Sequence, residues 1–234
     1  MSGHSKWSTI KRKKGATDAK RSGVFTRLAN TIIVAARTNK GLDLAIDHAK
    51  KANMPKDKIE NAILRGQGKI EGAQVEEVIY EAYGPESVAI IIKCLTDNKN
   101  RTVSSLRAVL NKYHGNLANS GAVAYLFELV GSIELPIKQE TLDRDNIEEI
   151  ILESGATDYV EDDEHFIIYT KPKELEEVKK NIEFKSLKIE SAKLAMNPKT
   201  YTDISDNKKE TIIKLLTAIE DNEDVDEVYI NADL

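Results

Sequence analysis

The fold is decided by residues 131–196, GSIELPIKQETLDRDNIEEIILESGATDYVEDDEHFIIYTKPKELEEVKKNIEFKSLKIESAKLAM. Short runs rich in Val, Ile and Tyr, separated by polar turns, predict strands. These strands are residues 131–136, 158–161, 165–170 and 189–196. Residues 142–153 and 173–184 space their apolar side chains as helices do. The order strand, helix, strand, strand, helix, strand is the βαββαβ pattern of ferredoxin-like domains.

The sequence on either side of this stretch predicts a second unit of the same kind. Before it come strand material at residues 78–96, a helix at 100–113, and short strands at 115–117 and 122–128. The helix and strand needed to complete that unit are found only at residues 206–219 and 225–232. We therefore predict a discontinuous α/β domain of residues 71–130 plus 200–234, with the domain of residues 131–199 inserted into it.

The N-terminal part shows only helical periodicity. Helices are predicted at residues 16–37, 42–52 and 55–66, with Pro55 in the first turn of the third and Gly66 at its end. Residues 1–70 therefore form a predicted all-helical domain, followed by the two ferredoxin-like domains in an α+β fold.

The composition is that of a globular protein without a membrane span. Of the 234 residues, 41% are hydrophobic and 31% charged, and no apolar run approaches the ~20 residues that a membrane helix needs. The N-terminus lacks the apolar core of a secretion signal. Cys94 is the single cysteine, which excludes an internal disulfide and fits a reducing compartment. We expect a cytoplasmic protein with Cys94 as a small buried side chain.

The charge is distributed very unevenly along the chain. The first forty residues hold ten Lys and Arg against one acid, Asp18. Residues 1–70 carry +11 and residues 71–234 carry −16, within a total of −5. Such an asymmetry indicates one end that meets a polyanion.

The candidate nucleic-acid contacts follow from this segment. Lys and Arg bind phosphates without reading sequence, and Trp7 offers a face on which a base could stack. The predicted set is Lys6, Trp7, Lys11, Arg12, Lys13, Lys14, Lys20, Arg21 and Arg27. A core position for Trp7 remains the alternative. The helix over residues 56–65 has mixed charge and few base-reading side chains on one face, so we expect weak sequence specificity on DNA, or recognition of structured RNA by shape.

A second candidate site lies at residues 96–102, TDNKNRT, between a predicted strand and helix. Asn98 can cap the helix, and Arg101 adds positive charge beside its N-terminal amides, which favour an anion. A plain strand-to-helix turn explains the same residues equally well.

Catalytic patterns find no support. The four histidines are scattered without metal-ligand spacing, and neither a nucleophile elbow nor a phosphate-binding glycine loop is present. We expect no enzyme activity, no metal and no cofactor.

Several motifs resemble those of the YebC/PmpR family, which includes the mitochondrial translational activator of cytochrome c oxidase. They are GHSKW (3–7), KRKKGATDAKR (11–21), VAAR (34–37), LAIDHAKKANMPKDKIENAI (44–63), YEAYGP (80–85), LTDNKNRT (95–102), GNL (115–117) and GAVAYLFE (121–128). The resemblance implies a helical domain followed by two α/β domains, one of them discontinuous. It also implies a cytoplasmic DNA-binding transcriptional regulator, although family members have been linked to translation and the ribosome.

Three hypotheses follow. The first is a DNA-binding regulator of transcription. The second is a ribosome-associated translation factor that binds RNA, ribosomal RNA included, through the same basic domain. The third is an enzyme or small-ligand protein with a site between the α/β domains. The sequence leaves open the choice between DNA and RNA and the oligomeric state, a monomer included.

Overall fold

The computed structural model describes residues 21–39, 41–72, 74–138, 144–162 and 164–234. Their contacts group them into two compact units. The larger unit holds residues 21–124 and 204–230, and the smaller unit holds residues 125–203 and 231–234. The division into three domains stays a prediction.

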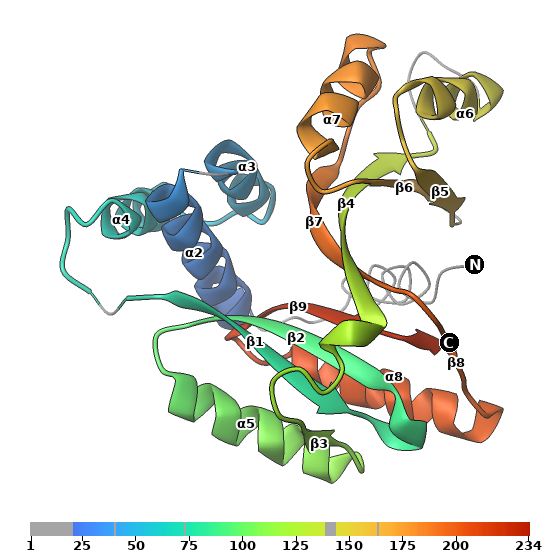
Figure 1. The fold of residues 1–234 in the computed structure, drawn as a ribbon. Coiled ribbons are helices and arrows are strands. Elements are labelled where there is room, and N and C mark those ends of the chain that lie inside the picture. The colour runs from blue at the N-terminus through green and yellow to red at the C-terminus, as the bar shows by residue number, and fades with distance from the viewer. Residues whose placement is uncertain (1–20, 40, 73, 139–143, 163) are drawn as a thin grey trace. The chain divides into compact units, whose positions relative to one another are not determined.

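Three helices open the larger unit (Figure 1). They are α2 (Arg21–Thr38), α3 (Leu42–Lys51) and α4 (Lys56–Gly66). Gly41 before α3 has φ 65°, a left-handed conformation that glycine adopts without strain. Pro55 stands immediately before α4, where its missing N–H costs nothing. Within the described residues these helices agree with the three that the sequence predicts.

A four-stranded antiparallel sheet follows in the same unit. Its strands are β1 (Glu76–Tyr83), β2 (Ala89–Thr96), β3 (Asn116–Leu117) and β9 (Val225–Ile230), in the order β3-β1-β2-β9. Helices α5 (Lys99–Lys112) and α8 (Asp206–Glu220) run along one face of this sheet (Figure 1). The prediction that the end of the chain completes this unit is therefore confirmed.

The strand predicted at residues 122–128 is wrong. The N–H groups of Gly121, Val123 and Ala124 donate to the carboxylate of Glu81, at 2.6, 2.6 and 2.9 Å. These backbone donors are therefore not available to a strand ladder. Ala124–Leu126 instead forms a short 3₁₀ helix, and the strand begins only at Phe127. In the sheet, β1 takes an inner position and pairs with both β2 and β3.

The smaller unit has the βαββαβ order that its sequence predicts. Its elements are β4 (Phe127–Pro136), α6 (Arg144–Glu153), β5 (Asp158–Glu161), β6 (His165–Thr170), α7 (Leu175–Phe184) and β7 (Ser191–Pro198). The strands lie in the order β5-β6-β4-β7, each antiparallel to its neighbour. Short strands β8 (Thr202–Asp203) and β10 (Ala232–Asp233) pair in parallel as a separate two-stranded sheet.

The predicted fold class, an α+β protein with an N-terminal helical region and antiparallel sheets, is confirmed. Among the helices in the described ranges, none combines the length and apolarity that crossing a membrane requires.

Glu81 provides a test of how residues 121–124 are held. Burial works to raise the pKa of this carboxyl, but hydrogen bonds from the backbone N–H groups outweigh it, and the pKa lies below the ordinary glutamate value. We expect Glu81→Gln to lower the free energy of unfolding at pH 7 by about 1–3 kcal/mol, because its amide nitrogen cannot accept those bonds. Urea unfolding measures this loss.

The pH profile gives the same test a second arm. A carboxyl with a lowered folded pKa stabilises the protein above its unfolded pKa, about 4.3, and loses this effect as the pH falls through the folded value. Glu81→Gln should therefore flatten the acid side of the stability profile. Glu71→Gln, at an exposed glutamate, should leave the profile unchanged. Equal profiles for the two variants would contradict the role given to Glu81.

Candidate nucleic-acid interface

Most of the sequence-predicted contacts lie outside the described residues. These are Lys6, Trp7, Lys11, Arg12, Lys13, Lys14 and Lys20. Arg21 is the first residue of α2, and its side chain also lies outside the description. The structure therefore places the side chains of Arg27, Asn98 and Arg101 from the predicted set.

Arg27 is half-buried on α2 and reaches the C-terminal end of α8. Its Nη2 donates to the carbonyl oxygen of Glu220 and lies 3.4 Å from that of Asn222. The last carbonyls of a helix lack partners within that helix, and a cation there also meets the negative end of its dipole. Arg27 thus fastens α2 to α8 inside the larger unit.

Asn98 and Arg101 stand at the N-terminus of α5. The Oδ1 of Asn98 accepts from the backbone N–H of Arg101 at 3.1 Å, which caps the helix. The Arg101 guanidinium lies 2.7 Å from Asp224 Oδ1 and 3.1 Å from Asp97 Oδ1. The hydrogen bond to buried Asp224 raises the pKa of Arg101. Both residues have structural partners, and their contact with an anion stays a prediction.

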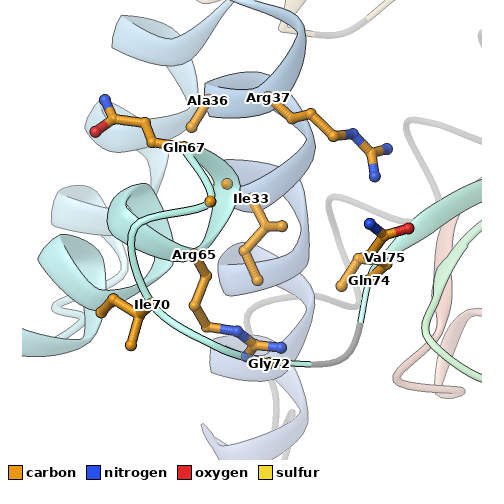
Figure 2. A pocket seen from close by; sticks show the side chains of 11 residues that line it. Ile33, Ala36, Arg37, Arg65, Gln67, Ile70, Gly72, Gln74 and Val75 are labelled. Atoms are coloured by element: carbon orange, nitrogen blue, oxygen red, sulfur yellow. The ribbon is translucent and has the colours of Figure 1, made fainter.

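The structure adds a hollow that sequence reasoning did not single out (Figure 2). It has a volume of about 400 Å³ and lies between α2, the end of α4 and the lining residues of segments 67–72 and 74–75. Gly66 makes it possible. A Cβ at this position would overlap the carbonyl oxygen of Ile33 and lie 2.7 Å from the Cβ of Ala36. Only glycine lets the end of α4 approach α2 this closely.

Polar side chains surround an apolar floor in this first hollow. Ile33 and Val75 are buried beneath it. In Figure 2 the guanidinium of Arg37 and the amide of Gln74 lie on one side, and the amide of Gln67 lies on the other. The Arg65 guanidinium rests against Gly72, where an added Cβ would come within 2.6 Å of its Nε.

A second hollow of about 370 Å³ shares Ile33 and Arg65 with the first. Lys58 lines it, with Nζ 5.6 Å from the centroid of the Phe25 ring. Among the described residues no carboxylate lines either hollow. We call the residues that line the two hollows the α2–α4 surface. Its cations are Arg37, Lys58 and Arg65.

A sequence signal for this surface did exist. Lys58, Asn61 and Arg65 are spaced by three and four residues, which places them on one face of α4, and all three line the second hollow. The acids Asp57 and Glu60 give this helix a mixed charge, which concealed the pattern in the sequence. Neither acid lines either hollow.

Comparison with known proteins gives a consistent result along the chain. Residues 5–69 match the family model "TACO1/YebC protein N-terminal domain", and residues 75–232 match "TACO1/YebC second and third domain". A probable transcriptional regulatory protein from Persephonella marina is 48% identical over 243 residues, covering 100% of this chain and 96% of that protein. Another from Thermosipho melanesiensis is 46% identical, covering 100% and 94%.

A solved structure supports the same relationship. The crystal structure of a conserved hypothetical protein, Aq1575 from Aquifex aeolicus, matches with a TM-score of 0.83 and 43% sequence identity. The match covers 92% of this chain and 91% of that chain.

Two glycines of the helical region should respond in opposite directions to the same substitution. Gly66→Ala should lower the free energy of unfolding by about 1–3 kcal/mol, because its methyl group overlaps α2. Gly23 in α2 has open space around it, so Gly23→Ala should raise stability by up to about 1 kcal/mol through helix propensity. Urea unfolding of both variants checks this, and a stabilising Gly66→Ala would refute the close packing.

Two arginines of α2 should also differ in how much their substitution changes the free energy of unfolding. Arg27→Met removes the donors to the end of α8 and should cost about 1–3 kcal/mol. Arg37→Met, at an exposed position, should stay within about 0.5 kcal/mol of the wild type. Thermal and urea unfolding provide the comparison. Equal losses would show that Arg27 has no special structural part.

Proposed function

The chain belongs to the TACO1/YebC family, and we propose that it is a nucleic-acid-binding regulator of gene expression that acts on DNA as a transcriptional regulator. Its relatives are named probable transcriptional regulatory proteins. We propose that binding takes place through the basic N-terminal region and the α2–α4 surface, in the cytoplasm and without a catalytic step.

The observation that carries this proposal is the separation of charge. Residues 1–70 carry +11, whereas the remainder carries −16. The α2–α4 surface continues the positive region into the described structure, where Arg37, Lys58 and Arg65 line hollows without a carboxylate among the described residues. A polyanion gains affinity there because each phosphate contact releases condensed counterions.

The proposed contacts combine both parts of this region. The predicted phosphate contacts are Lys6, Lys11, Arg12, Lys13, Lys14, Lys20 and Arg21, with Trp7 stacking. Arg37, Lys58 and Arg65 join them on the α2–α4 surface. Arg27, Asn98 and Arg101 are secondary contacts, because each already makes hydrogen bonds within the protein.

A ribosome-associated translation factor is the second candidate, and the hollows favour it. Duplex DNA keeps its bases stacked and presents only phosphates and groove edges to a hollow. Folded RNA offers unstacked bases in loops and bulges, and proteins recognise these by inserting them between side chains. The charge distribution serves either polyanion.

The salt dependence of binding tests what both candidate functions share, which is binding of a polyanion through the N-terminal segment. We expect Gln at positions 11–14 in place of Lys11, Arg12, Lys13 and Lys14 to weaken binding of a duplex DNA probe in fluorescence anisotropy. The slope of log affinity against log salt should fall by up to about 3.6, since each lost phosphate contact removes about 0.9.

A matched control removes the same charge elsewhere. Gln in place of Lys171, Lys173, Lys180 and Lys185, four exposed lysines of the smaller unit, should leave the slope unchanged. Equal effects of the two quadruple variants would refute binding through the N-terminal segment.

Cell lysates then separate the two candidates. On sucrose gradients, co-migration with ribosomal particles that resists DNase and is lost at raised salt would assign the protein to translation. Absence from those particles, with specific retention of a promoter fragment against competitor DNA, would assign it to transcription.

A further inference from the structure

We propose that the first hollow of the α2–α4 surface binds a single unpaired nucleotide of a longer nucleic acid. The inference rests on the proposed function and specifies what that surface recognises. It applies to a bulged, looped or single-stranded nucleotide, in RNA or DNA, because both present the same phosphate and base chemistry.

The size and lining of the hollow suit a nucleotide. Its volume of about 400 Å³ falls within the range of about 300–1,000 Å³ that small-ligand sites occupy. Ala36 and the exposed Ile70 provide apolar contact for the face of a base, over the buried Ile33 and Val75. Gln74 and Gln67 carry amides that can both donate and accept, as the edge of a base requires. A base within a duplex cannot reach this floor, because stacking encloses both its faces.

In this proposal side chains hold the phosphate. The N–H groups of Gln67, Gly68 and Lys69 donate to carbonyls of α4, so they are not available to an anion. Arg37 lines the hollow with a planar guanidinium that suits phosphate oxygens, and Arg65 adds a second positive charge to the lining. Glu76 lies 2.6 Å from Lys99 Nζ, which is the main cause of its lowered pKa, and the charge of Arg37 adds a smaller effect.

The hollow is formed before a ligand arrives. Gly66 holds the end of α4 against Ile33, and Val75 is 1% exposed within the core beneath α2. Arg65 packs on Gly72 between these two points. Because Gly66, Arg65 and Val75 are already held in place, little ordering of these residues is needed on binding, which lowers the entropic cost.

The position of the hollow favours a nucleotide within a chain over a free nucleotide. The second hollow adjoins it through Arg65 and Ile33, and there Lys58 and the Phe25 ring provide a cation and an aromatic face. A neighbouring nucleotide could occupy this region, so the cations of the two hollows can follow successive phosphates.

The test compares two labelled hairpins that differ by one unpaired nucleotide in the stem, each made as RNA and as DNA, with the full chain in fluorescence anisotropy. The hairpin with the unpaired nucleotide should bind about tenfold more tightly than the fully paired one. Arg37→Gln and Gln74→Ala should bring this ratio close to one. Lys51→Gln, which removes one charge from an exposed site outside both hollows, should preserve the ratio.

A photo-crosslink provides a second measurement that does not depend on variants. A thio-substituted base at the unpaired position should crosslink within residues 33–37 or 65–75. Crosslinking confined to residues 5–14 would overturn the proposal. So would equal binding of the two hairpins, although nucleic-acid binding itself would then stand.

Two further outcomes distinguish a failure of the proposed function from a failure of the single-nucleotide proposal. Failure to bind any of the hairpins at low salt would refute the proposed function as a whole. Displacement of the unpaired-nucleotide hairpin by adenosine monophosphate, with the paired hairpin still bound, would assign the hollow to a free nucleotide and overturn its assignment to a nucleic-acid chain.

Discussion

The close approach of α4 to α2 at Gly66 is the contact on which the basic surface depends. Helix α2 buries Ile32 and Ile33 in a core that also includes Val75 and Leu95, the first from the loop before β1 and the second from β2. The helical region and the first sheet therefore share apolar packing within the larger unit. Side chains and backbone reinforce it, because Asn30 donates to the carbonyl of Leu95 at 3.1 Å. Packing of this kind holds the backbone of α2 and α4, and so the Cα positions of the charged residues, in place.

Polar side chains in the larger unit fall into two groups, those bound within the protein and those that line the hollows. Arg27 satisfies the end of α8, Arg101 pairs with buried Asp224, and Glu81 gathers the backbone donors of residues 121–124. These contacts satisfy polar groups of the backbone and side chains that are wholly or partly buried. Arg37 and Lys58 instead line the hollows, where a ligand can reach them. Charge alone does not distinguish Arg27 from Arg37 and Lys58, since each adds one positive charge to the excess in residues 1–70.

The two sheets show how far local pattern determines topology. In the smaller unit each strand is separated from the next by a helix or a tight turn, so the order of elements leads directly to the ferredoxin-like arrangement. In the larger unit an extra hairpin partner, β1, occupies an inner position of the sheet. Residues 122–128 have the composition of a strand, but the carboxylate of Glu81 captures the first part of this segment. The remaining residues join β4, which pairs with β6 and β7.

The sequence by itself determined the helical N-terminus, the βαββαβ unit at residues 131–196, the use of the distant C-terminus to complete the first sheet, and the accumulation of positive charge at one end. All of these depend on periodicity and composition, which are local properties of a chain. Tertiary structure alone decided which strand occupies the inner position of the first sheet, which arginines are held by internal hydrogen bonds, and where Gly66 opens a hollow beside Arg37 and Arg65. These depend on contacts between residues far apart in the chain, such as Arg27 with Glu220, and spacing along a sequence does not encode such distances.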